Sequence, residues 1–560
     1  MLRLAPAATL ALMLGPVLAG LAGTLLPAVG YVPGLGGTQA SLAPLRTLLD
    51  QPGLATSVAL SLGTGLAATV LSLALVLAFT AAFEGTRAFR WMRRLLSPLL
   101  SVPHAAAAFG LAFLIAPSGF LMRLVSPWAS GATRPPDVLI LGDPLGLAMT
   151  LGLVAKEVPF LFLMVLAALP QTASPASRRI AASLGYAPVA AWVKVVLPRL
   201  YPQIRLPVFA VLAYATSVVD VALILGPTTP APLAVRLLAW MNDPDLAMRF
   251  VASAGALLQL GVSLGAIGLW IVGERIVAAL GRRWIAAGAR GSADRAVTLG
   301  AGAAMSALVG AMLLALCALC LWSVAGPWRF PDALPARFTL ATWAMHLDHM
   351  GTAIATTLAI AVPATLIAVA LALACLEGES RRGKAVRHRT LPLLYIPLIV
   401  PQIAFLFGLQ ILFLICGVHD TLAAVVLAHL VFVLPYVFLA LSDPWRAVDP
   451  RYGQLAGALG AAPARVFWRV RLPLALRAVA SAAALGLAVS VAQYLPTLLI
   501  GGGRVATVTT EAVALAAGGN RRLIALYALL QMILPFAAFA LAALAPGIAF
   551  RHRRDLQAAR

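Results

Sequence analysis

The chain has 560 residues, of which 62% are hydrophobic and only 11% are charged, and its mean hydropathy is +0.96. A soluble domain carries about 25% charged and at most about 50% apolar residues, so this composition excludes a soluble globular protein and indicates one that lies in a bilayer. The net charge of +22 would also suit a nucleic-acid-binding protein, so the distribution of the charge must decide.

Apolar runs long enough to cross a membrane recur along the whole chain. Crossing ~30 Å of hydrocarbon takes about 20 helical residues. We predict about twelve spans, at 4–28, 57–82, 95–115, 144–169, 204–226, 250–272, 297–324, 351–375, 391–416, 421–441, 478–500 and 523–549. With a cytoplasmic N-terminus, the predicted cytoplasmic segments hold about three times as many Lys and Arg residues as the external loops. The basic charge therefore reflects topology, and we expect a multi-pass bacterial inner-membrane protein with both termini cytoplasmic and no nucleic-acid partner.

The first apolar run could be taken for a secretory signal, because it follows Arg3 and has small residues at Ala19 and Gly20. It is about twice as long as the apolar region of a signal peptide, which has roughly 7–15 residues. Retaining it gives each half of the chain six spans. We therefore expect it to be a membrane helix.

No motif in the chain carries bond chemistry. Cys317 and Cys320 form a CxxC pattern, but they lie in an apolar run without His or acidic neighbours and are typical of packing residues. The segment 378–385 resembles a phosphate-binding loop, yet Ala385 replaces the hydroxyl that would hold Mg²⁺ and no strand precedes it. We expect no metal, cofactor or catalytic site in this chain, and any ATP must be bound by a separate subunit.

The chain contains an internal repeat, in which Gly460 follows Gly185 by 275 positions. Weaker matches lie upstream, between 102–110 and 400–408. Because each half has an even number of spans, the halves should be related by an axis along the membrane normal. We predict repeats over 1–290 and 291–560. The identical pairs in the strongest stretch are Ala181 and Ala456, Leu184 and Leu459, Gly185 and Gly460, Ala187 and Ala462, Pro188 and Pro463, Val195 and Val470, Leu197 and Leu472, and Pro198 and Pro473.

All of the chain should be helical, because irregular backbone in hydrocarbon leaves unpaired polar groups that cost several kcal/mol each. Four prolines lie inside predicted spans: Pro103, Pro159, Pro401 and Pro435. We expect each of them to kink its helix.

The repeated element predicts two short helices joined at a glycine. The first covers about 175–184, and Gly185 ends it where a positive φ is expected. The second runs from Pro188 to Leu197, where Pro198 should stop it. The second copy places Asp449-Pro450, Gly460, Pro463 and Leu472-Pro473 in the same roles.

Such a pair of helices would project from the membrane as a compact element suited to a groove on a partner. We expect its exposed face to include Trp192 and Lys194 in the first copy and Phe467 and Arg469 in the second.

This pattern resembles the cytoplasmic loop of binding-protein-dependent ABC importers, whose consensus is Glu-Ala-Ala, three residues, Gly, twelve residues, Pro. The resemblance covers nearly the whole chain, because two copies on twelve spans look like the fused permeases of ferric-iron and thiamine uptake systems. It implies the type I importer permease fold, with coupling loops over about 172–200 and 447–475.

The resemblance also implies partners. These are two copies of an ATPase subunit that binds ATP and Mg²⁺, an external solute-binding protein and the surrounding lipid. The consensus glutamate falls on Arg179 and Gln454, so both copies depart from the pattern there. The positions implied to contact the ATPase are Arg179, Ala181, Leu184, Gly185, Ala187, Pro188, Leu197, Pro198, Gln454, Ala456, Leu459, Gly460, Ala462, Pro463, Leu472 and Pro473.

Charged and polar residues inside the spans are candidates for the substrate pathway. A charge at the bilayer centre costs about 2.5–3.5 kcal/mol on insertion scales, so each should face protein or water. Neighbouring Lys156 and Glu157 lie about 100° apart on a helix and should find partners on other helices. The alternative is interhelical hydrogen bonding or a buried ion pair. The candidates are Asp220, Lys156, Glu157, His104, Gln402 and Gln493.

We expect the permease subunit of an ABC importer that moves a small solute from an external binding protein. An ion-gradient-driven secondary transporter also has twelve spans in two halves, but it predicts no partner at Gly185 and Gly460. A membrane enzyme is disfavoured by the missing catalytic cluster. The alternative interpretation of the two loops is that they are helix-turn-helix connectors left by an internal duplication and bind no ATPase. Similar scaffolds handle iron, thiamine, polyamines and oxyanions.

Overall fold

A computed structural model describes residues 4–33, 36–172, 174–291, 294–382 and 391–550. Within these ranges ten spans are long and apolar enough to cross a membrane. Two bent pairs of helices would bring the number to twelve, which agrees with the predicted all-α fold. The ten spans are α1 (Ala5–Ala28), α3 (Leu54–Phe83), α5 (His104–Ile115) with α6 (Phe120–Val125), α7 (Leu147–Ala168), the helix from α9 (Pro188–Ala191) through α10 (Leu197–Ser217), α13 (Met248–Ala286), α14 (Asp294–Ser323), α16 (Leu347–Arg382), α19 (Leu422–Arg446) and α26 (Arg521–Ala549).

Two bent pairs depart from the predicted single spans at 391–416 and 478–500, and the second pair also includes part of the predicted loop 447–475. The first pair is α17 (Leu391–Ile399) with α18 (Gln402–Ile415), bent by 85°. The second is Pro463–Leu474 with α23 (Leu476–Val491), bent by 76°. The remaining short helices of the described ranges are α2 (Ala43–Leu49), α4 (Arg87–Leu99), α8 (Ser174–Ser183), α11 (Asp220–Leu225), α12 (Leu233–Met241), α15 (Ala341–Met345), α20 (Pro450–Ala458), α24 (Leu495–Ile500) and α25 (Val508–Ala514).

Two of the four prolines predicted to kink spans lie inside helices, and the other two lie between helices. Pro159 and Pro435 lie inside α7 and α19. Pro103 and Pro401 instead lie directly before α5 and α18 and separate them from the preceding helix. The physical reason is that a proline disfavours helical backbone at the residue before it, and its own fixed φ and missing N–H suit the start of a helix.

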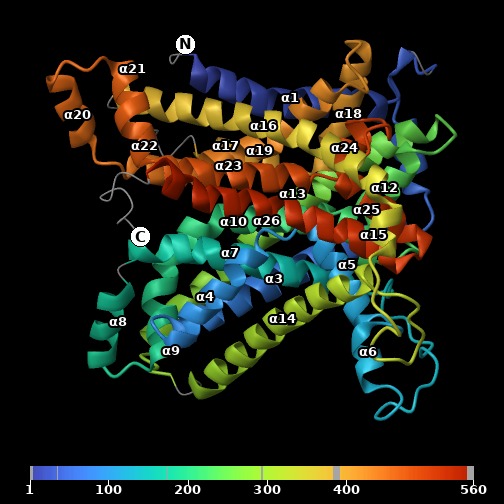
Figure 1. The fold of residues 1–560 in the computed structure, drawn as a ribbon, viewed down its shortest axis with the longest axis horizontal. Coiled ribbons are helices and arrows are strands. Elements are labelled where there is room, and N and C mark those ends of the chain that lie inside the picture. The colour runs from blue at the N-terminus through green and yellow to red at the C-terminus, as the bar shows by residue number, and fades with distance from the viewer. Residues whose placement is uncertain (1–3, 34–35, 173, 292–293, 383–390, 551–560) are drawn as a thin grey trace.

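The first helix of each predicted repeat packs against the other repeat. Helix α1 lies along α18, α16 and α19, whereas α14 lies along α5 and α3. Figure 1 shows this exchange, with blue α1 beside the gold and orange helices and yellow-green α14 beside the blue and cyan ones. The two halves are therefore interlocked.

Glycines allow the close approach of α1 and α18. A Cβ on Gly408 would overlap the backbone of Gly20, Gly23 and Thr24. The Thr24 hydroxyl accepts a hydrogen bond from the Gly408 N–H at 3.1 Å. Small residues are how membrane helices achieve such contact, because lipid provides no hydrophobic force between helices.

We predict that Gly408→Ala destabilises the protein by about 1–3 kcal/mol, because the added methyl meets backbone atoms that cannot move aside. Gly310→Ala in α14 is the matched control, since a Cβ there meets nothing within 4 Å. The measurement is the thermal unfolding midpoint in detergent. Equal midpoints for the two variants would contradict the close packing.

Candidate functional site

The first candidate coupling loop (residues 174–198) contains the two short helices that the sequence predicts. Helix α8 ends at Ser183, and Gly185 has a φ of +79°. The predicted stop at Pro198 is wrong. A π-helical segment, Trp192–Val196, continues α9 into α10, and Pro198 lies in the first turn of α10. The Leu197 N–H donates to the Trp192 carbonyl in this π-helical turn, so the helix continues past the proline.

The second candidate coupling loop (residues 450–474) has the same plan. The Asp449 carboxylate caps α20 by accepting a hydrogen bond from the Arg451 N–H at 2.8 Å, and Gly460 has a φ of +81°. A π-helical segment, Phe467–Arg471, again follows α21 (Pro463–Val466), 275 positions after its counterpart. Here the chain does break, at Ala475, directly after α22 (Leu472–Leu474).

Both loops project from the same end of the helix bundle (Figure 1). Their tips carry matching apolar side chains, because Leu184 is 60% exposed and Leu459 is 80% exposed. Ile180 and Leu455, one turn earlier, are also exposed, so each loop carries a pair of apolar side chains on one helix face, as is typical of a protein contact. Of the other implied coupling residues, Ala181 is buried, while Ala187, Leu197, Ala456, Leu472 and Pro473 are half-buried, and Arg179, Gly185, Pro188, Pro198, Gln454, Gly460, Ala462 and Pro463 are exposed.

The two loops differ in how they are held. Trp192 and Lys194 are buried, so the prediction that they lie on the exposed face is wrong. The Trp192 indole donates a hydrogen bond to the Glu84 carboxylate at 2.8 Å. The Lys194 ammonium donates to the backbone oxygens of Trp284 and Ala289. Each side chain is buried because its polar tip finds an acceptor outside its own helix.

In the second loop Phe467 is half-buried against Trp445, with ring centroids 5.9 Å apart, and Arg469 is exposed. Trp468 beside it is 66% exposed. The second loop is therefore the more open of the two.

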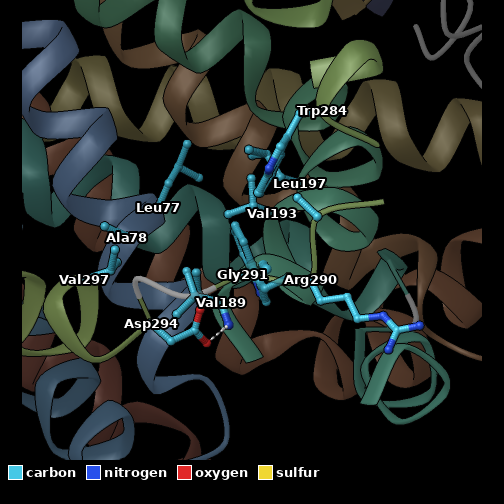
Figure 2. A pocket seen from close by; sticks show the side chains of 14 residues that line it. Leu77, Ala78, Val189, Val193, Leu197, Trp284, Arg290, Gly291, Asp294 and Val297 are labelled. Atoms are coloured by element: carbon cyan, nitrogen blue, oxygen red, sulfur yellow. Dashed lines mark hydrogen bonds between the residues drawn. The ribbon is translucent and has the colours of Figure 1, made fainter. Parts of the chain in front are cut away.

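The segment between the predicted repeats fastens the first loop. The Val189 N–H donates to the Asp294 carboxylate at 2.7 Å, and the Ala187 N–H donates to the Arg290 carbonyl at 2.9 Å. An adjacent cavity has a volume of about 760 Å³. Figure 2 shows its lining side chains, with the Arg290 side chain directed away from the others. Its lining is largely apolar and includes Leu77, Val193 and Val297.

A polar cluster lies inside the membrane-spanning part of the first half. His104 Nε2 and Glu157 Oε1 are 3.3 Å apart, and the His104 and Tyr214 rings have centroids 4.6 Å apart. The Tyr214 hydroxyl donates to Asp220 at 3.4 Å. Glu157 and Asp220 are both more than nine-tenths buried. Tyr214 was not among the candidates, because a tyrosine in an apolar run gives no signal of its own.

Lys156 points elsewhere, as its angle to Glu157 predicts. Its ammonium donates to the backbone oxygens of Leu100 at 2.8 Å and Leu99 at 3.4 Å, where α4 ends. A cation suits the end of a helix, where carbonyls lack intrahelical partners. Lys156 thus caps α4 from a neighbouring span.

Four of the pathway candidates lie at breaks between helices. His104, Gln402 and Asp220 are the first residues of α5, α18 and α11, and Gln493 lies between α23 and α24. Within the described residues, neither Gln402 nor Gln493 makes a side-chain hydrogen bond to the cluster around His104. A separate polar group in the second half joins His429 to Ser490 and Thr497.

This arrangement defines a class of protein: a multi-pass α-helical transport permease with paired loops at one end and polar residues at helix breaks. Comparison with known proteins gives the family. Residues 364–551 match the family described as "Binding-protein-dependent transport system inner membrane component". The chain is 31% identical over 507 residues to the inner membrane ABC transporter permease protein YnjC of Escherichia coli, covering 90% of each chain.

Shorter stretches match other permeases. A quarter of the chain is 34% identical over 151 residues to the molybdenum transport system permease protein ModB of Mycobacterium tuberculosis, covering 56% of that protein. Another match, 29% identical over 139 residues, is to the spermidine/putrescine transport system permease protein PotC of Haemophilus influenzae, covering 52% of it.

The chain therefore belongs to the binding-protein-dependent ABC importer permeases. It is the permease subunit of an importer with the type I fold, it is not an enzyme, and it is a multi-pass inner-membrane protein. Membership implies ATPase and solute-binding partners. The relatives whose names include a substrate are permeases for molybdenum and for spermidine and putrescine. They do not support the expectation of iron or thiamine as the substrate.

Proposed function

We propose that the loops over about 172–200 and 447–475 are coupling loops that dock into two copies of an ATPase subunit. The observation that carries this proposal is the pair of matching tips, in which an exposed leucine precedes a positive-φ glycine at one end of the bundle. ATP and Mg²⁺ would be bound by the ATPase subunits, and this chain would hold no cofactor. Because Arg179 and Gln454 replace the consensus acid, docking would depend on the apolar tips and the shape of the loops.

The repeat assignment is part of this proposal. Repeats over 1–290 and 291–560 are supported by the two glycines and the two π-helical segments that recur 275 positions apart. The bundle end that carries both loops would be cytoplasmic together with both termini, and lipid would cover the apolar outer faces of the spans.

Docking is tested by valine substitutions at the two loop glycines. A β-branched side chain is strongly disfavoured at positive φ, so Gly185→Val with Gly460→Val should distort both tips. We expect that the ATPase subunit no longer copurifies with the permease and that transport falls. The permease should remain inserted in the membrane. Gly281→Val in α13 is the control, because a Cβ there meets nothing within 4 Å. Normal copurification with the double variant would refute the assignment.

The orientation is tested with single cysteines in a variant whose native cysteines are replaced by serine. Leu184 lies at the tip of the first loop, and Leu139 is 65% exposed on the segment between α6 and α7. A membrane-impermeant maleimide should label Leu139→Cys in intact cells and Leu184→Cys only after permeabilisation. Labelling of Leu184→Cys from outside would reverse the topology.

We further propose that the polar cluster around Asp220 lines the solute pathway. The support is its position at the break between α10 and α11, since irregular backbone in a membrane protein is tolerated where it lines a cavity or is buried in protein. His104 and Glu157 face the same cluster. The solute would be small and delivered by the binding protein, and iron or thiamine is suggested by the resemblance alone.

Asp220→Asn should lower uptake severalfold while leaving assembly with the ATPase unchanged, because it removes the charge but keeps the size of the side chain. The measurement is uptake of the solute held by the partner binding protein, normalised to assembled complex. Asp243→Asn is a matched control, since the Asp245 N–H donates to one oxygen of Asp243, Oδ1, and an amide oxygen can still accept this bond. Unchanged normalised uptake in Asp220→Asn would exclude a role for its charge.

A further inference from the structure

A Glu-Gly pair recurs at one end of the second long helix of each half. Glu84-Gly85 follows the last residue of α3, and Glu377-Gly378 lies near the end of α16, 293 positions later. Both carboxylates are shielded, with side chains 13% and 5% exposed. The internal matches that define the coupling loops do not include either glutamate.

Glu84 joins both short helices of the first loop to the end of α3. Its Oε2 accepts hydrogen bonds from the Ser174 hydroxyl at 2.7 Å and from the Trp192 indole at 2.8 Å. Arg178 lies 3.5 Å from the same oxygen and also donates to the Glu84 backbone oxygen at 3.2 Å. Ser174 and Arg178 belong to α8, whereas Trp192 begins the π-helical segment, so one carboxylate bridges the loop.

Glu377 makes the corresponding connection in the second half with different partners. Its Oε2 is 3.0 Å from Arg471, the last residue of the π-helical segment. Its Oε1 is 2.7 Å from Arg381, which in turn donates to the Pro463 backbone oxygen at 3.2 Å. The second loop is therefore tied to α16 both directly and through Arg381.

We propose that Glu84 and Glu377 are positioning residues that hold the coupling loops to the ends of α3 and α16 and transmit motion between loop and span. They supply, from outside the loop, a carboxylate that Arg179 and Gln454 do not provide within it. A buried carboxylate with several donors forms a rigid joint, because removing it strands every donor without a partner. This inference rests on the proposed docking of the loops to the ATPase.

The test separates docking from transmission. The permease is reconstituted in liposomes with its ATPase and loaded binding protein. Copurification of the ATPase then reports docking, while solute transported per ATP hydrolysed reports transmission. We expect Glu84→Ala with Glu377→Ala to keep copurification, because Leu184 and Leu459 at the tips are unchanged. Transport per ATP should fall severalfold, because each loop loses the carboxylate that joins it to its span.

A graded series distinguishes a joint from general loss of structure. Glu84→Gln keeps one carbonyl acceptor for Trp192 or Ser174. Its transport per ATP should therefore lie between that of the wild type and that of Glu84→Ala. Trp192→Phe removes only the indole donor, and its effect should not add fully to that of Glu84→Ala because the two changes break one contact. It also provides the test if Glu84→Ala does not assemble.

Glu274→Gln is the matched control, since Glu274 pairs with Arg205 at 2.7 Å within the spans and touches neither loop. It should leave transport per ATP unchanged. A wild-type ratio in the assembled Glu84→Ala, Glu377→Ala variant or in Trp192→Phe would overturn the inference. If that wild-type ratio were found while the Gly185→Val, Gly460→Val variant still lost copurification, the inference about the glutamates would fail. The proposal that the loops dock to the ATPase would stand.

Discussion

In hydrocarbon, an unpaired backbone N–H or C=O costs several kcal/mol, and this constraint organises the whole protein. Long helices satisfy it along most of the chain. Where helices break, other parts of the protein must cover the free groups. At the end of α4, the Lys156 ammonium covers the free carbonyls by donating hydrogen bonds to Leu99 and Leu100. A charge that would be costly alone is thus stabilised by the break, and the break by the charge.

The same breaks place polar side chains in the interior. His104 and Asp220 begin helices that start within the membrane-spanning part, and Glu157 and Tyr214 reach them from continuous helices. The second half has breaks at equivalent places but carries glutamine there. The matched positions share a break between helices, while the charged side chains lie in the first half.

The loops show the same separation of backbone from side chains. Positive φ at Gly185 and Gly460 and the π-helical segments are shared, because they set the shape of the element. The attachments differ: the first loop is fastened by Glu84 and Asp294, whereas Glu377 reaches the second through arginines.

The sequence by itself determined the features that depend on local chemistry. Apolar length determines the spans, the charge bias predicts their orientation, and a recurring glycine predicts the turn in each loop, because an L side chain is disfavoured at positive φ. The family follows from the same residues. The positions of helix ends were less accessible, since Pro103 and Pro401 could either kink a helix or begin one.

Only the tertiary structure decided which residues meet across long separations. Trp192 is buried because Glu84, 108 positions away, accepts a hydrogen bond from its indole N–H. Gly408 has no room for a side chain because α1 packs against it, and its partner Thr24 is 384 positions away in the chain. Local periodicity contains no information about such partners. Packing between helices therefore determines the acceptors of Lys156, the burial of Lys194 and the exchange of α1 and α14 between the halves. The physical reason is that a buried polar or close-packed group is stable only beside its complement.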